Sequence, residues 1–239
     1  AVLALLAWRL AALRLDTSGW LYADHLMAAG RPEQALASLA RAQDDSDPAR
    51  FLTLFALAQT GRLPWEMFHY PQQASSDALL LRDTVWDTNP VVAKWRSDLY
   101  LELGRVNESQ RWAHEALAME GETPRVLERL GLVNVLNGNV ETARIFFRAL
   151  ERAPFHAARA RAYLAALDRD PRMSADPRVA RIRPLMLTKD YVGDFTTEQI
   201  LLQSLEANPS NRMAFEYLLA HYLLTSDMDG FAMLAPWLK

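Results

Sequence analysis

The residues that most often bind metals or transfer protons are scattered through this sequence. Neither a His-x-x-x-His nor a His-Glu-x-x-His spacing occurs, so no helix would present two imidazoles to one zinc ion. Cysteine is absent, which excludes disulfides, thiol catalysis and cysteine-bound metals. A glycine-rich phosphate loop and a nucleophile elbow are missing as well. The sequence therefore predicts no catalytic residues, no metal site and no cofactor, and a protein that is not an enzyme.

Two acidic motifs come closest to a cation site. Asp227-Met-Asp229-Gly230 resembles the middle of a calcium loop, but Thr225 stands where the first carboxylate should be. Pro236 occupies the position that needs a bidentate glutamate, so the motif is rejected. Asp168-Arg-Asp170 and Asp176 would bracket a cation only if the interleaved arginines left room, and a solvated loop explains them better.

Arginine is concentrated in one stretch of the chain. Residues 159–183 contain seven arginines against three aspartates, a surplus of four positive charges, whereas the chain from residue 190 onward is mainly acidic. One interpretation is a basic surface for an acidic partner or anionic lipid headgroups. A second is docking onto the acidic C-terminal segment of the same or a neighbouring copy, and a third is a solvated loop without a function. The residues assigned to this basic patch are Arg159, Arg161, Arg178, Arg181 and Arg183.

Length, composition and charge favour an ordered helical protein. Half of the 239 residues are hydrophobic (51%) and only nine are glycine, which excludes a disordered chain. A net charge of −3 argues against nucleic acid as the main partner, since nucleic-acid-binding domains usually carry a basic excess. A chain of this length is large for one compact core, but a repeat array grows by adding local interfaces.

A helical repeat is visible in the spacing of two glycines. Gly104 and Gly138 lie 34 residues apart, and each ends one apolar, helix-periodic stretch and precedes another. This is the period of the tetratricopeptide repeat, a helix–turn–helix unit that stacks into a solenoid. In the clearest copy, residues 123–154, small residues are expected where two helices cross and a large one where the next unit packs. The positions that resemble the repeat's pattern are Leu127, Leu130-Gly131, Asn134, Gly138, Ala143, Phe147 and Pro154.

The same periodicity predicts helices along most of the chain and no strand. The fold class is all-α: a tetratricopeptide-like, right-handed α-solenoid of antiparallel helix pairs with irregular insertions. Pairs are expected within 16–155, then a helix and a proline- and arginine-rich connection over 156–195, then C-terminal helices with a last repeat-like pair over 196–239. Asn107 is expected to cap a helix that begins at Glu108, and Thr196 to begin another. The predicted helices cover residues 18–29, 32–42, 49–60, 65–69, 91–103, 108–119, 157–167, 211–225 and 227–238.

The first fifteen residues carry a separate prediction. Eight apolar residues, Ala1-Val-Leu-Ala-Leu-Leu-Ala-Trp8, precede the first charge, whereas a spanning helix needs about 20. Residues 1–15 are interpreted either as the end of a transmembrane helix, with Trp8, Arg9 and Arg14 at the lipid–water interface, or as an amphipathic helix that caps the solenoid. The residues alone favour neither.

Longer stretches resemble a known family. Leu57-Ala-Gln-Thr-Gly61 with Met67-Phe-His-Tyr-Pro71, and Asn208-Pro-Ser-Asn-Arg-Met-Ala-Phe-Glu-Tyr217 with Tyr222-Leu-Leu224, are similar to the C-terminal region of a family of uncharacterised multi-spanning bacterial membrane proteins. The resemblance covers most of the chain after about residue 16. It brings no catalytic roles with it. It implies that a membrane-embedded portion precedes the repeat-like domain and that 1–15 ends its last helix.

The side of the membrane is left open. Arginines just after an apolar run favour the cytoplasmic side by the positive-inside tendency, but the signal here rests on two charges. We expect a membrane-associated protein whose soluble domain lies outside the cytoplasmic membrane, in the periplasm or at the surface.

A binding face can be predicted from the helix period. In such a solenoid the first helix of each pair lines the concave side, so Lys94, Asp98 and Glu102, one turn apart, would face a groove that Arg125 and Glu128 extend. Mixed charge suits a protein or peptide partner. The favoured function is a non-enzymatic protein–protein interaction scaffold, with self-association or a larger complex as a variant. The alternative is a ligand-binding or regulatory cap over a membrane-embedded transport or catalytic region upstream of residue 1.

Overall fold

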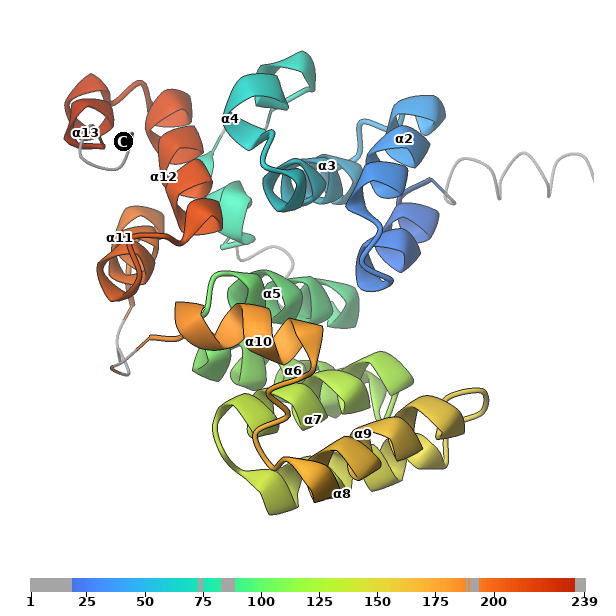
Figure 1. Ribbon diagram of the computed structural model, residues 1–239. Helices are drawn as coiled ribbons and strands as arrows, with labels where there is room; N and C mark the ends of the chain where they lie inside the picture. The colour runs from blue at the N-terminus through green and yellow to red at the C-terminus, as the bar shows by residue number, and fades with distance from the viewer. Residues whose placement is uncertain (1–18, 73–74, 83–88, 188, 190–193, 235–239) are drawn as a thin grey trace, which may run out of the picture. The chain divides into compact units, whose positions relative to one another are not determined.

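The computed structural model describes residues 19–72, 75–82, 89–187, 189 and 194–234. These residues form helices and connecting turns, and none of the described residues lies in a strand (Figure 1). The prediction of an all-α fold is confirmed. The chain divides into two compact units, which are taken one at a time. The first contains the described residues up to Leu79 and from Glu216 onward, and the second is Leu80–Phe215.

The second unit carries the repeat-like helices, and each one packs against the next from α5 to α9 (Figure 1). The connections are tight because Gly104 (φ +79°) and Gly138 (φ +78°) adopt the left-handed conformation just beyond the ends of α5 and α7. The hairpins that surround these two glycines therefore lie side by side. The helices of this unit are α5 (Pro90–Glu102), α6 (Val106–Glu120), α7 (Pro124–Leu136), α8 (Val140–Glu151), α9 (Ala157–Arg169), α10 (Pro177–Ile182), η4 (Arg183–Leu185) and α11 (Thr197–Ala207).

The α7–α8 crossing is as close as the small residues predicted. A Cβ atom on Gly131 would lie 2.2 Å from Cε1 of Phe147, so the phenyl ring fills the space that a larger residue would take. Phe147 is fully buried and stacks on Tyr163 of α9, with ring centroids 4.7 Å apart. One ring thus joins three consecutive helices.

The chain after α9 folds back onto the helices before it. Met173, Val179 and Ile182 are buried in the same apolar core as α6, α7 and α8. The prolines of this stretch limit α10 to six residues, as expected from their spacing. The short helix packs against α7 (Figure 1). The connection predicted as proline- and arginine-rich is therefore a packed part of the unit.

The other unit contains helices of mixed length, from the 14 residues of α3 to the four residues of α4. Residues 19–28 are helical, and α2 and α3 pack against each other as a pair. Ser46 caps α3, with its side chain accepting a hydrogen bond from the Ala49 amide at 3.4 Å. The remaining elements are α2 (Pro32–Ala42), α3 (Asp47–Thr60), α4 (Leu63–Glu66), η1 (Met67–His69) and α13 (Met228–Met233). Two elements run across the limits between the units: η2 (Ser76–Leu80) and α12 (Arg212–Thr225).

Helix ends show where sequence reasoning succeeded and failed. Thr196 begins α11 with a capping box: its hydroxyl accepts from the Gln199 amide, and the Gln199 side chain accepts from the Thr196 amide. The expected cap at Asn107 is wrong, because α6 already begins at Val106 after the Gly104 turn. Of the last predicted helix, 227–238, the structure describes α13 (Met228–Met233), and residues 235–238 lie outside the described part of the chain.

The predicted anchor lies outside the described residues. Trp8, Arg9 and Arg14, and the whole of 1–15, are not among them. Within the part of the chain that the structure describes, no helix combines the length and the apolar character needed to cross a bilayer.

The α7–α8 contact can be tested by Gly131→Ala. In a helix interior this change should stabilise by about 1 kcal/mol through helix propensity. Because the added methyl group collides with the Phe147 ring, we expect a net loss of about 1–3 kcal/mol in the free energy of unfolding, measured by urea denaturation. Gly131→Ala combined with Phe147→Leu should lose less than the sum of the single changes. A stabilising Gly131→Ala would contradict the close crossing.

Candidate functional site

The predicted face is built from α5 and α7, which lie next to each other. On α5, Lys94, Asp98 and Glu102 follow one another at intervals of four residues and therefore share a stripe. On α7, Arg125 and Glu128 stand three residues apart. Each of the five makes an ion pair, and in every case the partner belongs to a different helix.

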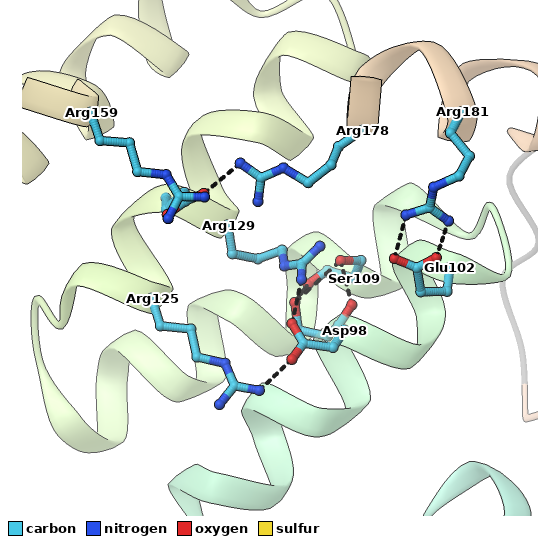
Figure 2. A network of polar contacts seen from close by, with 10 residues as sticks. Asp98, Glu102, Ser109, Arg125, Arg129, Arg159, Arg178 and Arg181 are labelled. Carbon is cyan, nitrogen blue, oxygen red and sulfur yellow. Dashed lines mark hydrogen bonds and ion pairs between the residues drawn. The ribbon is translucent and has the colours of Figure 1, made fainter. Parts of the chain in front are cut away.

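Asp98 lies at the centre of this face. Arg125 and Arg129, both from α7, each donate a hydrogen bond to a different oxygen of its carboxylate (Figure 2). The Asp98 side chain is only 13% exposed. Burial by itself would raise the pKa of Asp98, but the two guanidinium groups outweigh it and hold that pKa below its usual range. Asp98 is therefore a fixed negative charge that ties α5 to α7.

A small hollow opens beside this pair of helices. Lys94 lies at its edge, and its Nζ donates to Glu120 Oε2 at the end of α6, 2.8 Å away. Residues of three helices line this depression, and its polar side chains come from α5 and α7. Its lining consists of Lys94, Ser97, Asp98, Ala113, Arg125, Val126 and Arg129.

Glu102 and Arg181 join α5 to α10. Both terminal nitrogens of Arg181 donate to the Glu102 carboxylate, one of them at 2.9 Å (Figure 2). This fork-to-fork geometry is the strongest form of an arginine–carboxylate contact. The hydrogen bond from Arg181 is the main reason why its pKa is raised above the ordinary value. The returning chain is therefore held to α5 by charge as well as by its buried apolar residues.

Glu128 collects three donors from α9 and α10. Its Oε1 lies 2.5 Å from an Arg178 nitrogen, 2.7 Å from an Arg159 nitrogen and 2.8 Å from the Tyr163 hydroxyl. The two arginines, both labelled in Figure 2, come from different helices, Arg159 from α9 and Arg178 from α10. Burial, together with the charge of Glu128, raises the pKa of Tyr163 to about 12, so its hydroxyl stays protonated and donates.

The two predicted sets of residues therefore meet in one network. Three arginines of the basic patch bind the carboxylates of the face: Arg159 and Arg178 bind Glu128, and Arg181 binds Glu102. The other two also have partners, since Arg161 lies 3.5 Å from Glu151 and Arg183 donates to the Arg172 carbonyl at 2.7 Å. The patch is a charge-compensated part of the unit. Its binding of an outside partner stays a prediction.

Sequence reasoning missed three members of the network. Arg129 follows Arg125 by one helical turn, so the helix period already contained the signal that would have found it. Glu120 and Tyr163 carry no such signal, because their contacts depend on how α6 and α9 pack against neighbouring helices.

What this site can do chemically is bind and position charged groups. Among the described residues, no group of three or more histidines, aspartates and glutamates is arranged to hold a metal ion. The raised pKa of Tyr163 follows from its burial and from the charge of Glu128, and the lowered pKa of Asp98 follows from its two arginine partners.

Comparison with known proteins gave one match. A protein-family model described as "Family of unknown function (DUF6057)" matches residues 3–238. No curated protein and no solved structure matches the chain.

The first prediction for this site concerns pH. Because the pKa of Asp98 is lower in the folded chain than its unfolded value of about 3.9, its stabilising effect is complete above that value and is lost as the pH falls through the folded pKa. The difference in unfolding free energy between wild type and Asp98→Asn should stay constant from pH 7 to pH 5 and shrink below about pH 4. Asp168→Asn, at a carboxylate that is 65% exposed, is the control and should change little at any pH. A difference for Asp98→Asn that persists to pH 2.5 would refute the assignment.

The second prediction compares the ion pairs of Glu128, whose side chain is only 10% exposed, with the exposed pair of Arg161 and Glu151. Arg178→Ala leaves the half-buried Glu128 cluster short of a cation and should cost about 1–2 kcal/mol of unfolding free energy. Arg161→Ala removes an exposed pair and should cost less than about 0.5 kcal/mol. Equal costs in thermal denaturation would show that the Glu128 cluster has no special weight.

Proposed function

The chain belongs to this family of unknown function (DUF6057), and from the arrangement of its charged residues we propose that it is a non-enzymatic protein–protein interaction scaffold. The observation that carries the proposal is Asp98, which is held between two arginines at the edge of a hollow. Such a site offers fixed charge to a partner. It does not offer a group ready to transfer a proton.

We propose that the helices of the second unit form a tetratricopeptide-like, right-handed solenoid. Two features support this architecture. The glycine-terminated hairpins repeat after 34 residues, and their helices pack in sequence order from α5 to α9. Small residues at the α7–α8 crossing agree with the pattern of that repeat. In such a solenoid α5 and α7 would line the concave side.

The ion pairs prepare the α5–α7 face for binding. Arg125, Arg129 and Lys94 are each 17–23% exposed and are held in place by carboxylates of the same unit. A partner would not have to order these long side chains, which lowers the entropic cost of association. The Arg129 guanidinium has five N–H donors, more than the one Asp98 oxygen that it contacts can accept. Carboxylates on a protein or peptide therefore match the face best.

The location of the scaffold remains a proposal from sequence. An apolar segment at residues 1–8, followed by arginines, supports association with a bacterial membrane through 1–15.

The binding role can be tested with a charge swap that keeps the Lys94–Glu120 pair. Lys94→Glu with Glu120→Lys should preserve the melting temperature and abolish the capture of partners, because the charge that faces a partner is reversed. Wild type and variant would be expressed in the native cells, cross-linked, purified and compared by quantitative mass spectrometry.

The matched control exchanges an outer pair, Arg161→Glu with Glu151→Arg, and should keep every partner of the wild type. Identical partner sets for all three proteins would exclude the α5–α7 face. If wild type enriches nothing over an empty-vector control, the scaffold proposal fails.

A further inference from the structure

The outer face of α8 carries arginines whose side chains pair with none of the residues that the structure describes. Arg144 on this helix is bound to Asp168 at 2.6 Å and to Glu141. Arg148 and Arg152 form no ion pair or side-chain hydrogen bond with any described residue, although both are exposed. They contrast with the arginines of the basic patch, each of which has a partner.

Two large apolar residues flank these arginines. Ile145, Arg148 and Arg152 follow one another at intervals of three and four residues, so they share one stripe of α8. Ile145 is 64% exposed, and Phe155, just beyond the end of the helix, is fully exposed. The opposite face of α8 is fully buried through Ala143, Phe147 and Leu150. This amphipathic helix therefore has a second apolar element that faces solvent.

The backbone at Phe155 gives an independent reason to look for a contact. Phe155 has a φ of +65°, in the left-handed region that bulky residues rarely adopt. Glycine would take this conformation without strain. The exposed ring gains no packing energy within the described chain to offset that strain. Strain of this kind is often found where a residue serves binding.

We propose that Ile145, Arg148, Arg152 and Phe155, the α8 stripe, are a docking surface for an acidic amphipathic helix of a partner protein. Charge complementarity supports this partner, because two guanidinium groups without an ion pair among the described residues lie in the sequence between two exposed apolar residues. A guanidinium binds a carboxylate with two parallel hydrogen bonds, so two glutamates one turn apart match the pair. Apolar residues at the outer ends of the partner helix would cover Ile145 and Phe155.

The spacing of the stripe specifies the partner further. From Ile145 the other members follow at three, seven and ten residues, a pattern that reads the same in both directions. A helix with Leu-x-x-Glu-x-x-x-Glu-x-x-Leu presents two glutamates at the spacing of Arg148 and Arg152, with one leucine for Ile145 and the other for Phe155 in the turn that follows α8. The helical part of the contact, from Ile145 to Arg152, extends over roughly 10 Å at about 1.5 Å per residue. This surface is distinct from the α5–α7 face and does not depend on it.

A synthetic probe tests the proposal on the full chain. The probe is a fluorescein-labelled peptide, Leu-Ala-Gln-Glu-Ala-Gln-Ala-Glu-Gln-Ala-Leu, and the readout is fluorescence anisotropy at 50 mM and 300 mM salt. We expect saturable binding that weakens at least fivefold at the higher salt, since it depends on ion pairs. A scrambled peptide of the same composition, with leucines and glutamates on different faces, should not bind. Equal binding of both peptides, or of neither, overturns the proposal.

Variants of the chain locate the surface. Arg148→Glu with Arg152→Glu should weaken peptide binding at least tenfold. Arg169→Glu with Arg172→Glu makes the same change in charge at two exposed residues outside the stripe and should stay within twofold of wild type. Equal losses in both double variants would show that only net charge matters, and the α8 stripe would be rejected.

Phe155→Gly gives the sharpest result, because folding and binding should respond in opposite directions. The melting temperature should stay the same or rise as the strain is relieved, while peptide binding weakens at least fivefold. Unchanged binding would overturn the role of Phe155. Vesicles containing 30% phosphatidylserine form the last arm: if they sediment wild type but not Arg148→Glu/Arg152→Glu, the stripe binds a lipid surface and the proposed protein partner is wrong.

Discussion

A carboxylate that is buried away from water needs a cation next to it, and this requirement determines which helices contact each other from α5 to α10. Asp98, Glu102 and Glu128 lie where helices meet, and each binds at least one arginine from another helix. An unpaired carboxylate in such a position would cost several kcal/mol. The chain after α9 supplies cations for two of the three, and it buries Val179 and Ile182 in the core at the same time. Charge and apolar packing thus hold the same segment.

Local patterns were sufficient to predict much of the fold. Apolar periodicity and Gly104 and Gly138 located the hairpins to within a few residues, because helix ends depend on neighbouring residues in the sequence. Thr196 was predicted to begin a helix in the same way, from the residues next to it in the sequence, and it caps α11. The prediction for Asn107 was wrong. An asparagine near a helix start has the chemistry of a cap, but α6 begins at Val106, soon after the turn at Gly104, so Asn107 lies within its first turn.

Only part of the site could be predicted from the sequence, because several of its contacts join residues that are far apart in the chain. The helix period correctly placed Lys94, Asp98 and Glu102 on one stripe. It could not reveal that Arg181 binds Glu102 from 79 residues away, or that Arg178 binds Glu128 from 50 residues away. Those contacts depend on the path of the connection after α9, which the prolines interrupt and no periodic pattern describes. From the sequence, a basic surface open to a partner was therefore one of three interpretations of the stretch 159–183. In the structure, the arginines assigned to the patch bind other residues of the chain.

The density of charge along a sequence is thus a poor guide to which charges are available. The stretch 159–183 has the largest arginine surplus, yet the arginines assigned to the patch each have a partner within the chain. Arg148 and Arg152 stand outside that stretch and have none among the described residues. Three of the patch arginines bind carboxylates that the packing of helices has largely buried: Arg159 and Arg178 bind Glu128, and Arg181 binds Glu102. Folding accounts for an arginine that neutralises a buried acid. It does not account for one held in solvent beside an exposed, strained phenylalanine, and such residues are where a binding role is best sought.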